Sequence, residues 1–239
     1  MDNSYWVSGI HSVQAALDNQ NRIIEELVLL KDSENKLIIS RKIKIEIRDN
    51  KFFNKIFKLE NDFSLHQGVA ARIKPFPKKT IKDILLQKKE STILILDQIN
   101  DPRNIGAIIR NCIAFNVKFL ILENNSTNLK SNAMHRASSG YIEKISFIEV
   151  SNINNALLEL QKENFYIYGM DSNKGTQIDL VNFNVKKAIV LGSEGKGMRN
   201  NVREKCDQLI KIKTTQEMES LNVSNASAII LNHLWNSKN

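Results

Sequence analysis

From residue 91 onward, short apolar runs of strand length alternate with longer stretches of helical spacing. A run without polar alternation is typical of a strand that is covered on both faces of its sheet. Such strands, alternating with helices such as the one expected over 154–163, predict a parallel α/β sheet with helices on both sides. The runs that carry this pattern are residues 92–96, 118–122, 165–168 and 188–191.

Residues 1–74 have a different pattern and predict a separate small α/β domain, with strands at 27–30 and 67–73. The stretch that follows, Lys-Pro-Phe-Pro-Lys-Lys over 74–79, holds two of the chain's three prolines, which disfavour a helix and suit an extended linker. We therefore divide the chain into a small domain (1–74), a basic linker (75–90) and a large α/β domain (91–239).

The net charge of +8 favours a polyanionic partner, with nucleic acid as the first candidate and an acidic protein surface as the alternative. The positive excess is densest in the linker. A linker beside a phosphate backbone would use this charge, although a solvated lysine-rich face has the same composition. The charged residues of the linker are Lys78, Lys79, Lys82, Lys88, Lys89, Asp83 and Glu90.

Several classes of protein are disfavoured by the composition. Cys112 and Cys206 lie far apart without a second thiol nearby, so neither a disulfide framework nor a metal site is indicated. No apolar run approaches the length of a membrane span, and the first residues lack a secretion pattern. We therefore expect a cytoplasmic protein with no membrane partner.

Three loops that follow apolar strands or precede an apolar helix carry candidate functional residues. The first, residues 97–110, leads from a strand into a helix and holds Asn104 and Arg110. Loops at the carboxyl ends of parallel strands line the ligand crevice, and the start of a helix offers free amides to an anion. Taken alone, this turn is weak evidence for a site, because most turns of this kind merely cap a helix.

The second loop, residues 190–198, holds three glycines together with Glu194. Glycine lets the backbone turn sharply and approach a ligand closely, but the sequence is not that of a phosphate-binding P-loop. The third loop, residues 219–228, places Ser220 and Asn222 among small polar residues before an apolar helix expected at 229–235. A glycine-rich turn without a ligand and an N-terminal helix cap are the respective alternatives.

In this order and spacing, the three loops resemble the three motifs of the SpoU/TrmH family of SPOUT methyltransferases. The resemblance covers about residues 91–236, and the third motif, Ser-Leu-Asn-Val-Ser over 220–224, is matched without a change. The other motif positions are occupied by Asn104, Gly106, Arg110, Leu191, Gly192, Glu194 and Gly197.

The N-terminal part extends the resemblance. Residues 8–13 and 65–72 resemble the ends of the small L30e-like substrate-binding domain of the RlmB-type branch. That branch methylates a guanosine ribose in large-subunit (23S) ribosomal RNA, so the resemblance implies 23S rRNA as the partner and a basic linker placed to contact it. A tRNA ribose 2′-O-methyltransferase is the alternative within the family.

The resemblance implies S-adenosylmethionine as the methyl donor, no metal, a trefoil knot in the C-terminal domain, and a homodimer. The donor-binding residues it implies are Leu191, Gly192, Gly197, Ile212 and Leu221. The residues it places around the reacting ribose are Asn104, Arg110, Glu194, Ser220 and Asn222. The apolar helix residues expected to be exposed at the dimer interface are Ile229, Ile230 and Trp235.

Arg110 has been given the part of general base in this family, but a guanidinium stays protonated in proteins. We favour an electrostatic role, in which the fixed cation stabilises the developing alkoxide while solvent or a phosphate accepts the proton. The chain departs from the family pattern at residues 213–216, where a proline and a glycine are usual, and at Tyr141, where a small residue is common. The first departure puts the shape of the donor loop in question.

Two hypotheses come from other classes of protein. A non-catalytic RNA-binding protein would keep the small domain and the linker but would not need the four polar residues Asn104, Arg110, Glu194 and Asn222. Titration with S-adenosylmethionine separates this hypothesis from an enzyme. A Rossmann-type nucleotide enzyme would need Gly-x-Gly-x-x-Gly after the first strand, where residues 101–104 read Asp-Pro-Arg-Asn.

Overall fold

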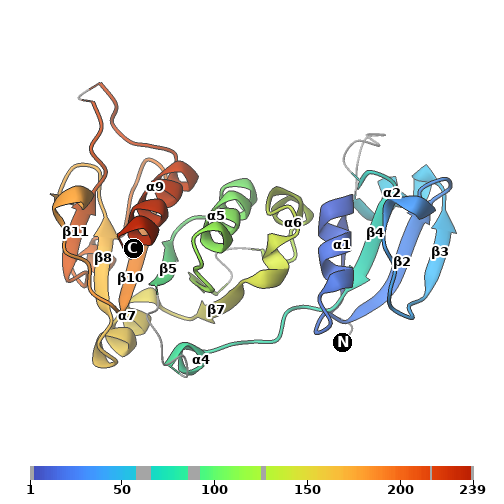
Figure 1. Ribbon diagram of the computed structural model, residues 1–239, viewed down its shortest axis with the longest axis horizontal. Coiled ribbons are helices and arrows are strands. Elements are labelled where there is room, and N and C mark those ends of the chain that lie inside the picture. The colour runs from blue at the N-terminus through green and yellow to red at the C-terminus, as the bar shows by residue number, and fades with distance from the viewer. Residues whose placement is uncertain (1–2, 58–65, 86–91, 125–127, 216, 238–239) are drawn as a thin grey trace. The chain divides into compact units, whose positions relative to one another are not determined.

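The structure, a computed structural model, describes residues 3–57, 66–85, 92–124, 128–215 and 217–237. The chain forms two compact units (Figure 1). The first contains Met1–Pro77 and Leu129–Glu143, and the second contains Lys78–Asn128 and Lys144–Asn239. A segment that lies between two strands of the second unit in sequence therefore packs with the first unit.

The first unit is built on a four-stranded sheet of order β1-β4-β2-β3. Strand β4 runs antiparallel to β1 and β2, whereas β2 and β3 are parallel. The two strands expected in this region are β2 and β4, and the apolar face of α1 packs on them. The elements are β1 (Tyr5–Ser8), α1 (Ile10–Asp18), β2 (Ile24–Leu30), η1 (Glu34–Lys36), β3 (Ile45–Arg48), α2 (Asn50–Phe57), β4 (Val69–Ile73), α6 (Asn132–Ala137) and η2 (Tyr141–Lys144).

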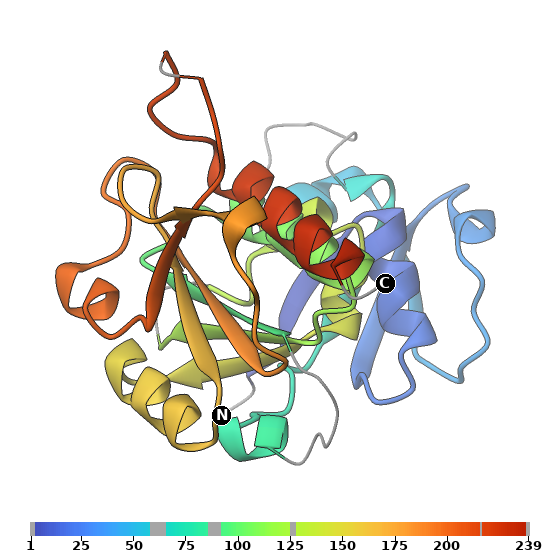
Figure 2. The same cartoon turned by 60° about the vertical axis from the view of Figure 1, so that its left-hand side comes forward.

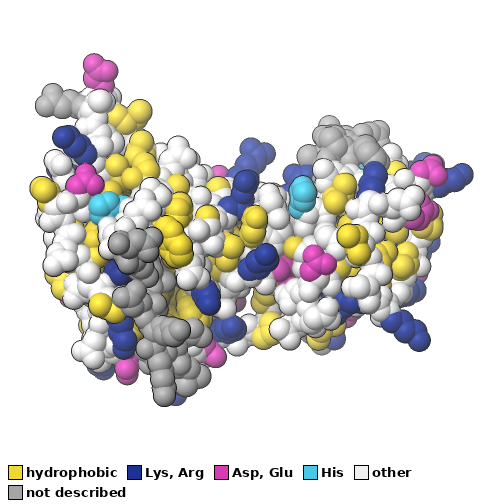
Figure 3. Space-filling model, viewed as in Figure 1, with side chains coloured by type: hydrophobic (Ala, Val, Ile, Leu, Met, Phe, Trp, Pro, Cys, Tyr) yellow, Lys and Arg dark blue, Asp and Glu magenta, His cyan; other side chains and the backbone are white. Residues whose placement is uncertain are grey.

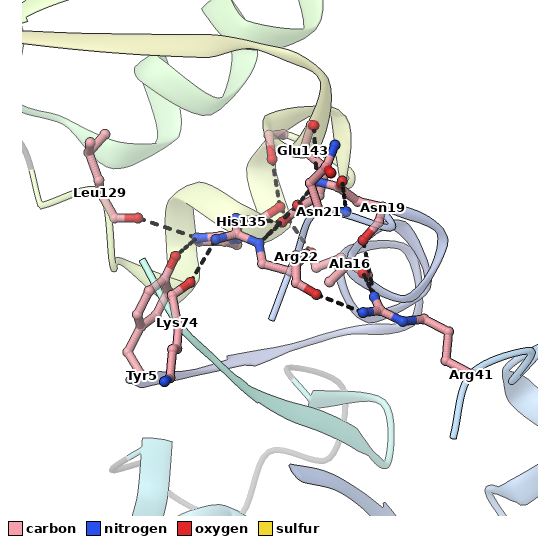
Figure 4. Close-up of polar contacts among 12 residues, drawn as sticks. Tyr5, Ala16, Asn19, Asn21, Arg22, Arg41, Lys74, Leu129, His135 and Glu143 are labelled. Carbon is pink, nitrogen blue, oxygen red and sulfur yellow. Dashed lines mark hydrogen bonds and ion pairs between the residues drawn. The ribbon is translucent and has the colours of Figure 1, made fainter. Parts of the chain in front are cut away.

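A buried ion pair holds the 129–143 segment within this unit. Arg22, after α1, donates from Nε and Nη2 to the carboxylate of Glu143 at 2.7–3.1 Å, and its Nη1 donates to the carbonyl of Lys74 at 2.8 Å (Figure 4). Both side chains are almost fully buried. Removing one partner would leave an uncompensated buried charge, which costs about 3–5 kcal/mol. The pair therefore makes 129–143 an integral part of the first unit.

The second unit contains a seven-stranded sheet of order β7-β6-β5-β10-β8-β11-β9, in which every neighbouring pair is parallel. The four strands expected from the apolar runs are β5, β6, β8 and β10, and the expected helix is α7. The elements are α4 (Ile81–Leu85), β5 (Thr92–Asp97), α5 (Pro102–Ala114), β6 (Phe119–Glu123), β7 (Ser146–Val150), α7 (Ile153–Lys162), β8 (Tyr166–Met170), β9 (Thr176–Gln177), η3 (Ile178–Leu180), β10 (Lys187–Gly192), α8 (Asn200–Arg203), β11 (Gln208–Lys211) and α9 (Val223–Asn236).

Helices cover both faces of this sheet, as the continuous apolar strands require. Helices α5 and α9 lie side by side on one face, and α7 lies on the other (Figures 1 and 2). Ile93 and Ile95 of β5 belong to the core under α7, so Leu94 and Leu96 between them point to the opposite face. All four side chains are at most 2% exposed.

Residues 74–79 contain no helix, as expected of an extended segment, whereas a helix follows later in the range 75–90. Residues 81–85 form the short helix α4, because Ile81 and Ile84 are buried in the core of the second unit. Lys88 and Lys89 lie outside the described residues. None of the helices in the described part of the chain is both long and apolar enough to span a membrane.

Candidate active site

Three polar side chains, one from each sequence motif, meet at the carboxyl end of the parallel sheet. The Nδ2 of Asn104 donates to Oε1 of Glu194 at 3.2 Å, and Nδ2 of Asn222 donates to Oδ1 of Asn104 at 3.1 Å. Asn222 also donates to the same Glu194 oxygen. Residues more than a hundred positions apart are thereby joined in one hydrogen-bonded cluster, the Asn–Glu–Asn cluster.

The start of α9 fixes one side of this cluster. Asn222 is the N-cap of the helix, and its Oδ1 accepts a hydrogen bond from the amide of Ser224 at 2.9 Å. The amide of Val223 donates to Oε1 of Glu194 at 3.2 Å. A carboxylate at a helix N-terminus is stabilised by the free amides and by the helix dipole. The helix begins at Val223 and not at 229 as expected, because Asn222 supplies the cap.

A cavity of about 530 Å³ opens beside the cluster, at the ends of β8, β10 and β11. This volume lies within the range that small-molecule sites occupy. Glu194 and Ser220 line the cavity, whereas Asn104, Arg110 and Asn222 do not. All five residues expected to bind the donor line it as well, namely Leu191, Gly192, Gly197, Ile212 and Leu221.

The lining of this cavity combines apolar side chains, glycine backbone and charged groups. Such a lining is suited to a nucleoside that has both apolar and polar parts. Leu191, Ile212 and Leu221 offer apolar contacts, while Lys211 and Glu219 bring charge to the wall. Of residues 213–216, which depart from the family pattern, Thr214 lines the cavity. Residue 216 lies outside the described residues. Residues 212–215 and 217–220 project from the second unit (Figures 1 and 3).

The glycine-rich loop is a tight turn closed on itself. Ser193 and Gly197 exchange backbone hydrogen bonds of 3.1 and 2.9 Å. The backbone of Gly192 lies so close to the turn that an added Cβ would be 2.2 Å from the carbonyl carbon of Gly197. Gly195 and Gly197 have φ of +81° and +67°, which favour glycine. The glycines therefore serve the shape of the turn, and Glu194 is carried near its tip.

Arg110 lies apart from the cluster. The loop at 97–110 could in principle have brought Asn104 and Arg110 together, but both lie within α5. Six helical residues separate them by about 9 Å along the axis. The side chain of Arg110 is exposed and makes no hydrogen bond or ion pair with the described residues. Its neighbour Asn111 instead joins α5 to α9, donating to the carbonyl of Ser224 and to Oγ of Ser227 at 2.8 Å.

Two arginines next to the glycine-rich loop, Arg199 and Arg203, are not among the residues predicted from the sequence to belong to the site. Arg199 binds the buried carboxylate of Asp97, and Nε of Arg203 lies 3.1 Å from Oδ2 of Asp171 in the cavity wall. Nothing in the local sequence around Arg199 and Arg203 predicts that they pair with Asp97 and Asp171. Cys206 follows α8, and burial raises the pKa of its thiol to about 12, so a thiolate nucleophile is not available there.

The Asn–Glu–Asn cluster supplies hydrogen-bonding groups to this site. Within the described ranges, no group of three or more histidine, cysteine or carboxylate residues has metal-binding geometry. The cluster instead offers amides, a carboxylate and an adjacent cavity, which together can position a hydroxyl group beside a bound cofactor.

Family comparisons agree with this arrangement. The sequence model of the SpoU rRNA Methylase family matches residues 91–232, and the model described as RNA 2'-O ribose methyltransferase substrate binding matches residues 6–79. The chain belongs to the SpoU rRNA methylase family. The expected fold class is thereby confirmed: a SPOUT methyltransferase domain of parallel α/β type with a small α/β domain before it.

Relatives of this SpoU chain match it over nearly its whole length. The 23S rRNA (guanosine-2'-O-)-methyltransferase RlmB of Escherichia coli K12 is 30% identical over 95% of this chain and 96% of its own. The RlmB of Vibrio vulnificus is 32% identical over 97% and 96%. Among solved structures, the SpoU methyltransferase AviRb of Streptomyces viridochromogenes, in complex with the cofactor AdoMet, superposes with a TM-score of 0.85, at 17% identity over 99% of this chain and 91% of its own.

Of the three residues expected to be exposed at a dimer interface, Ile230 is buried within this chain. Ile229 and Trp235 of α9 are 39% and 40% exposed, as expected. Ile230 is fully buried, because it lies on the same side of the helix as Ser227 and Leu234, which pack inside the second unit. Ile230 therefore belongs to the core of this chain.

Proposed function

We propose that this chain transfers the methyl group of S-adenosylmethionine to the ribose 2′-oxygen of a guanosine in 23S ribosomal RNA. The observation that carries the proposal is the junction of Asn104, Glu194 and Asn222 beside a cavity of suitable size. Relatives named guanosine-2'-O-methyltransferases match the chain over almost its full length, which supports the same substrate class.

The cavity is the proposed donor site. Side chains of Leu191, Ile212 and Leu221 would contact the adenosine, and the glycine backbone at 192 and 197 lets the donor approach closely. When bound, the donor supplies an electrophilic methyl group whose leaving group is already activated by the sulfonium charge. The protein's remaining tasks are positioning and electrostatics.

The Asn–Glu–Asn cluster prepares the ribose side of the reaction. Transfer forms a C–O bond at the ribose 2′-oxygen, breaks the donor's C–S bond and releases the hydroxyl proton. Because Glu194 accepts hydrogen bonds from both amides, Asn104 and Asn222 are held in fixed orientations before RNA arrives. Together with Ser220 they would orient the ribose, and the proton would pass to solvent or to a phosphate. The family resemblance adds Arg110, which lies outside the cluster in this chain and would stabilise the alkoxide as a fixed cation.

The two other parts of the chain would serve RNA binding. We assign residues 1–74 to recognition of the RNA substrate, residues 75–90 to a basic connection along the phosphate backbone, and residues 91–239 to catalysis, except for the segment 129–143, which packs within the first unit. The match of residues 6–79 to a substrate-binding family supports this division. Because ribosomal RNA is the proposed substrate, we place the protein in the cytoplasm.

We also propose that the protein is a homodimer. Ile229 and Trp235 expose apolar surface along α9, next to the cavity-forming start of the same helix. Multi-angle light scattering is expected to give twice the chain mass, and Ile229→Glu should shift the protein toward monomer. A wild-type mass equal to one chain would contradict the dimer.

The decisive experiment offers 23S rRNA and bulk tRNA separately to the purified protein with methyl-labelled S-adenosylmethionine. Labelled 23S rRNA whose modified position resists alkaline hydrolysis on the 3′ side is the expected result. Labelling of tRNA alone would favour the tRNA methyltransferase alternative. Calorimetric titration with the donor that gives neither heat nor thermal stabilisation would favour the non-catalytic RNA-binding protein.

A further inference from the structure

The turn that carries Glu194 is a small rigid unit whose position depends on its two ends. Backbone hydrogen bonds between Ser193 and Gly197 close it, and the Gly192 backbone packs directly against it. A closed turn of this kind moves as a body when one of its attachments is released. The distance between Glu194 and Asn104 therefore depends on how residues 192 and 198–199 are attached to the sheet.

Both attachments converge on one residue, Asp97, through its backbone at one end of the turn and through its buried carboxylate at the other. At the outgoing end, Gly192 is the parallel partner of Asp97 at the end of β5. At the returning end, the backbone amide of Arg199 donates to Oδ2 of Asp97 at 2.8 Å, and its Nε donates to Oδ1 at 2.7 Å. Nη2 of Arg199 lies 2.7 Å from the same Oδ1. The loop thus leaves the sheet beside Asp97 and returns to it.

Asp97 also begins the loop that leads to Asn104. It is the last residue of β5 and is fully buried, and α5 starts five residues later at Pro102. Asp97 is thereby common to the two loops whose side chains meet at 3.2 Å in the Asn–Glu–Asn cluster, since it begins one loop and binds the returning end of the other. Glu123, at the end of β6, is an outer partner of Arg199, 3.1 Å from its Nη2.

We infer that Arg199 is a positioning residue: by binding Asp97 it fixes the 193–197 turn so that Glu194 stays within hydrogen-bond reach of Asn104. The expected effect of Arg199 on turnover rests on the proposed methyl transfer. Its expected effect on the position of the turn does not. Arg203, the last residue of α8, pairs separately with Asp171 in the cavity wall, just after β8. A guanidinium is suited to this task because it binds one carboxylate through several donors at once.

The test compares the wild-type chain with Arg199→Lys, which keeps the charge beside buried Asp97 but loses the multiple contact. We expect kcat for 23S rRNA to fall about 10-fold, since small misplacements of reacting groups have large kinetic effects, while the donor KM changes little. A second readout needs no activity. The amide of Val223 donates to Glu194 and should exchange with deuterium about fivefold faster in the variant.

The matched control is Glu204→Gln, which changes an exposed residue just after α8. It should match the wild type in both readouts. If Arg199→Lys fails to fold, the neutral double variant Asp97→Asn with Arg199→Gln replaces it, and the same acceleration of Val223 exchange is expected.

Three results are informative in different ways. Wild-type kcat and wild-type Val223 exchange in a folded Arg199→Lys protein would overturn the inference. A slower kcat with unchanged Val223 exchange would overturn it too, because the turn would not have moved. An inactive wild-type protein would refute the proposed function, and Val223 exchange alone would then decide whether Arg199 holds the turn.

Discussion

Asn104 donates a hydrogen bond from Nδ2 to Oε1 of Glu194 over 3.2 Å, although 90 residues separate them in sequence. The same oxygen accepts from the side chain of Asn222 and from the amide of Val223. Glu194 is thus the common acceptor that joins the end of β10 to the starts of two helices, α5 and α9. Substitution of Glu194 can separate the effect of its negative charge from the effect of its position as a hydrogen-bond acceptor.

Glu194→Gln keeps an acceptor oxygen but removes the negative charge at the start of α9. We expect kcat to fall about 100-fold, because the two asparagine amides lose a charged partner that fixes their orientation. Stability should fall by only about 0.5 kcal/mol, the usual size of a charge effect at a helix N-terminus. Labelled methyl transfer and urea unfolding measure the two effects. Glu217→Gln, at an exposed residue outside the cavity, is the control, and equal activity of both variants would contradict the role of Glu194.

Arg110→Lys tests the electrostatic role of the arginine. The side chain is exposed and has no partner among the described residues, so the substitution should leave the free energy of unfolding unchanged. We expect donor affinity to persist and kcat to fall about 100-fold, since an ammonium offers no planar fork to the ribose and its phosphate. Single-turnover methyl transfer and calorimetry measure these two quantities. If turnover and donor binding both survive intact, neither the electrostatic nor the general-base role stands.

Gly192→Ala and Gly195→Ala separate crowding from backbone strain in the donor loop. A Cβ at residue 192 would lie 2.2 Å from Gly197 and Met198 backbone atoms, so the turn must move. At residue 195 a Cβ meets nothing within 4 Å, and only the positive φ is unfavourable, at a cost of about 1 kcal/mol. Calorimetric titration with S-adenosylmethionine should show loss of binding for Gly192→Ala and a much smaller loss for Gly195→Ala. The reverse order would show that the close approach of Gly192 is unimportant.

Much of the second unit could be predicted from local sequence signals. Apolar runs marked β5, β6, β8 and β10 because buried parallel strands need no polar alternation. The cluster residues Asn104, Glu194 and Asn222 were accessible only through the order of their motifs, since no local rule says that three distant loops meet. The burial of Ile230 could have been read from the helical spacing of residues 223, 227 and 230, once the helix was known to begin at Val223.

Long-range packing accounts for what the sequence did not reveal. The segment 129–143 carries no composition that assigns it to the first unit, because its attachment depends on the pairing of Arg22 with Glu143, 121 residues away. The pairing of Arg199 with Asp97 spans 102 residues and is equally invisible to local patterns. Ion pairs of this kind depend on burial, which exists only after the chain has folded.

His135 in α6 gives the first unit a pH-dependent stability. Its ring lies 3.2 Å from the hydroxyl of Tyr5 and 3.3 Å from the carbonyl of Leu129 (Figure 4). Burial, assisted by the positive charge of Arg22, lowers the pKa of His135 to about 3. The unfolded chain binds a proton near pH 6.5 and the folded chain does not, so stability is fully present above about pH 6.5 and is lost as the pH falls toward 3.

We therefore expect the free energy of unfolding of the first unit to fall by about 1.4 kcal/mol for each pH unit below about 6.5 because of this one residue. Trp6 lies in the first unit and Trp235 in the second, so urea unfolding in a Trp235→Phe background follows the first unit by the fluorescence of Trp6. Adding His135→Gln should lower stability at neutral pH, because the packing of the ring is lost, but should remove this part of the acid dependence. Comparing pH 7.5 with pH 5.5, the His135 protein should lose about 1.4 kcal/mol more than the variant. If both proteins lost the same free energy of unfolding between pH 7.5 and pH 5.5, His135 would accept a proton equally well in the folded and unfolded chains. The proposed acid dependence would then be wrong.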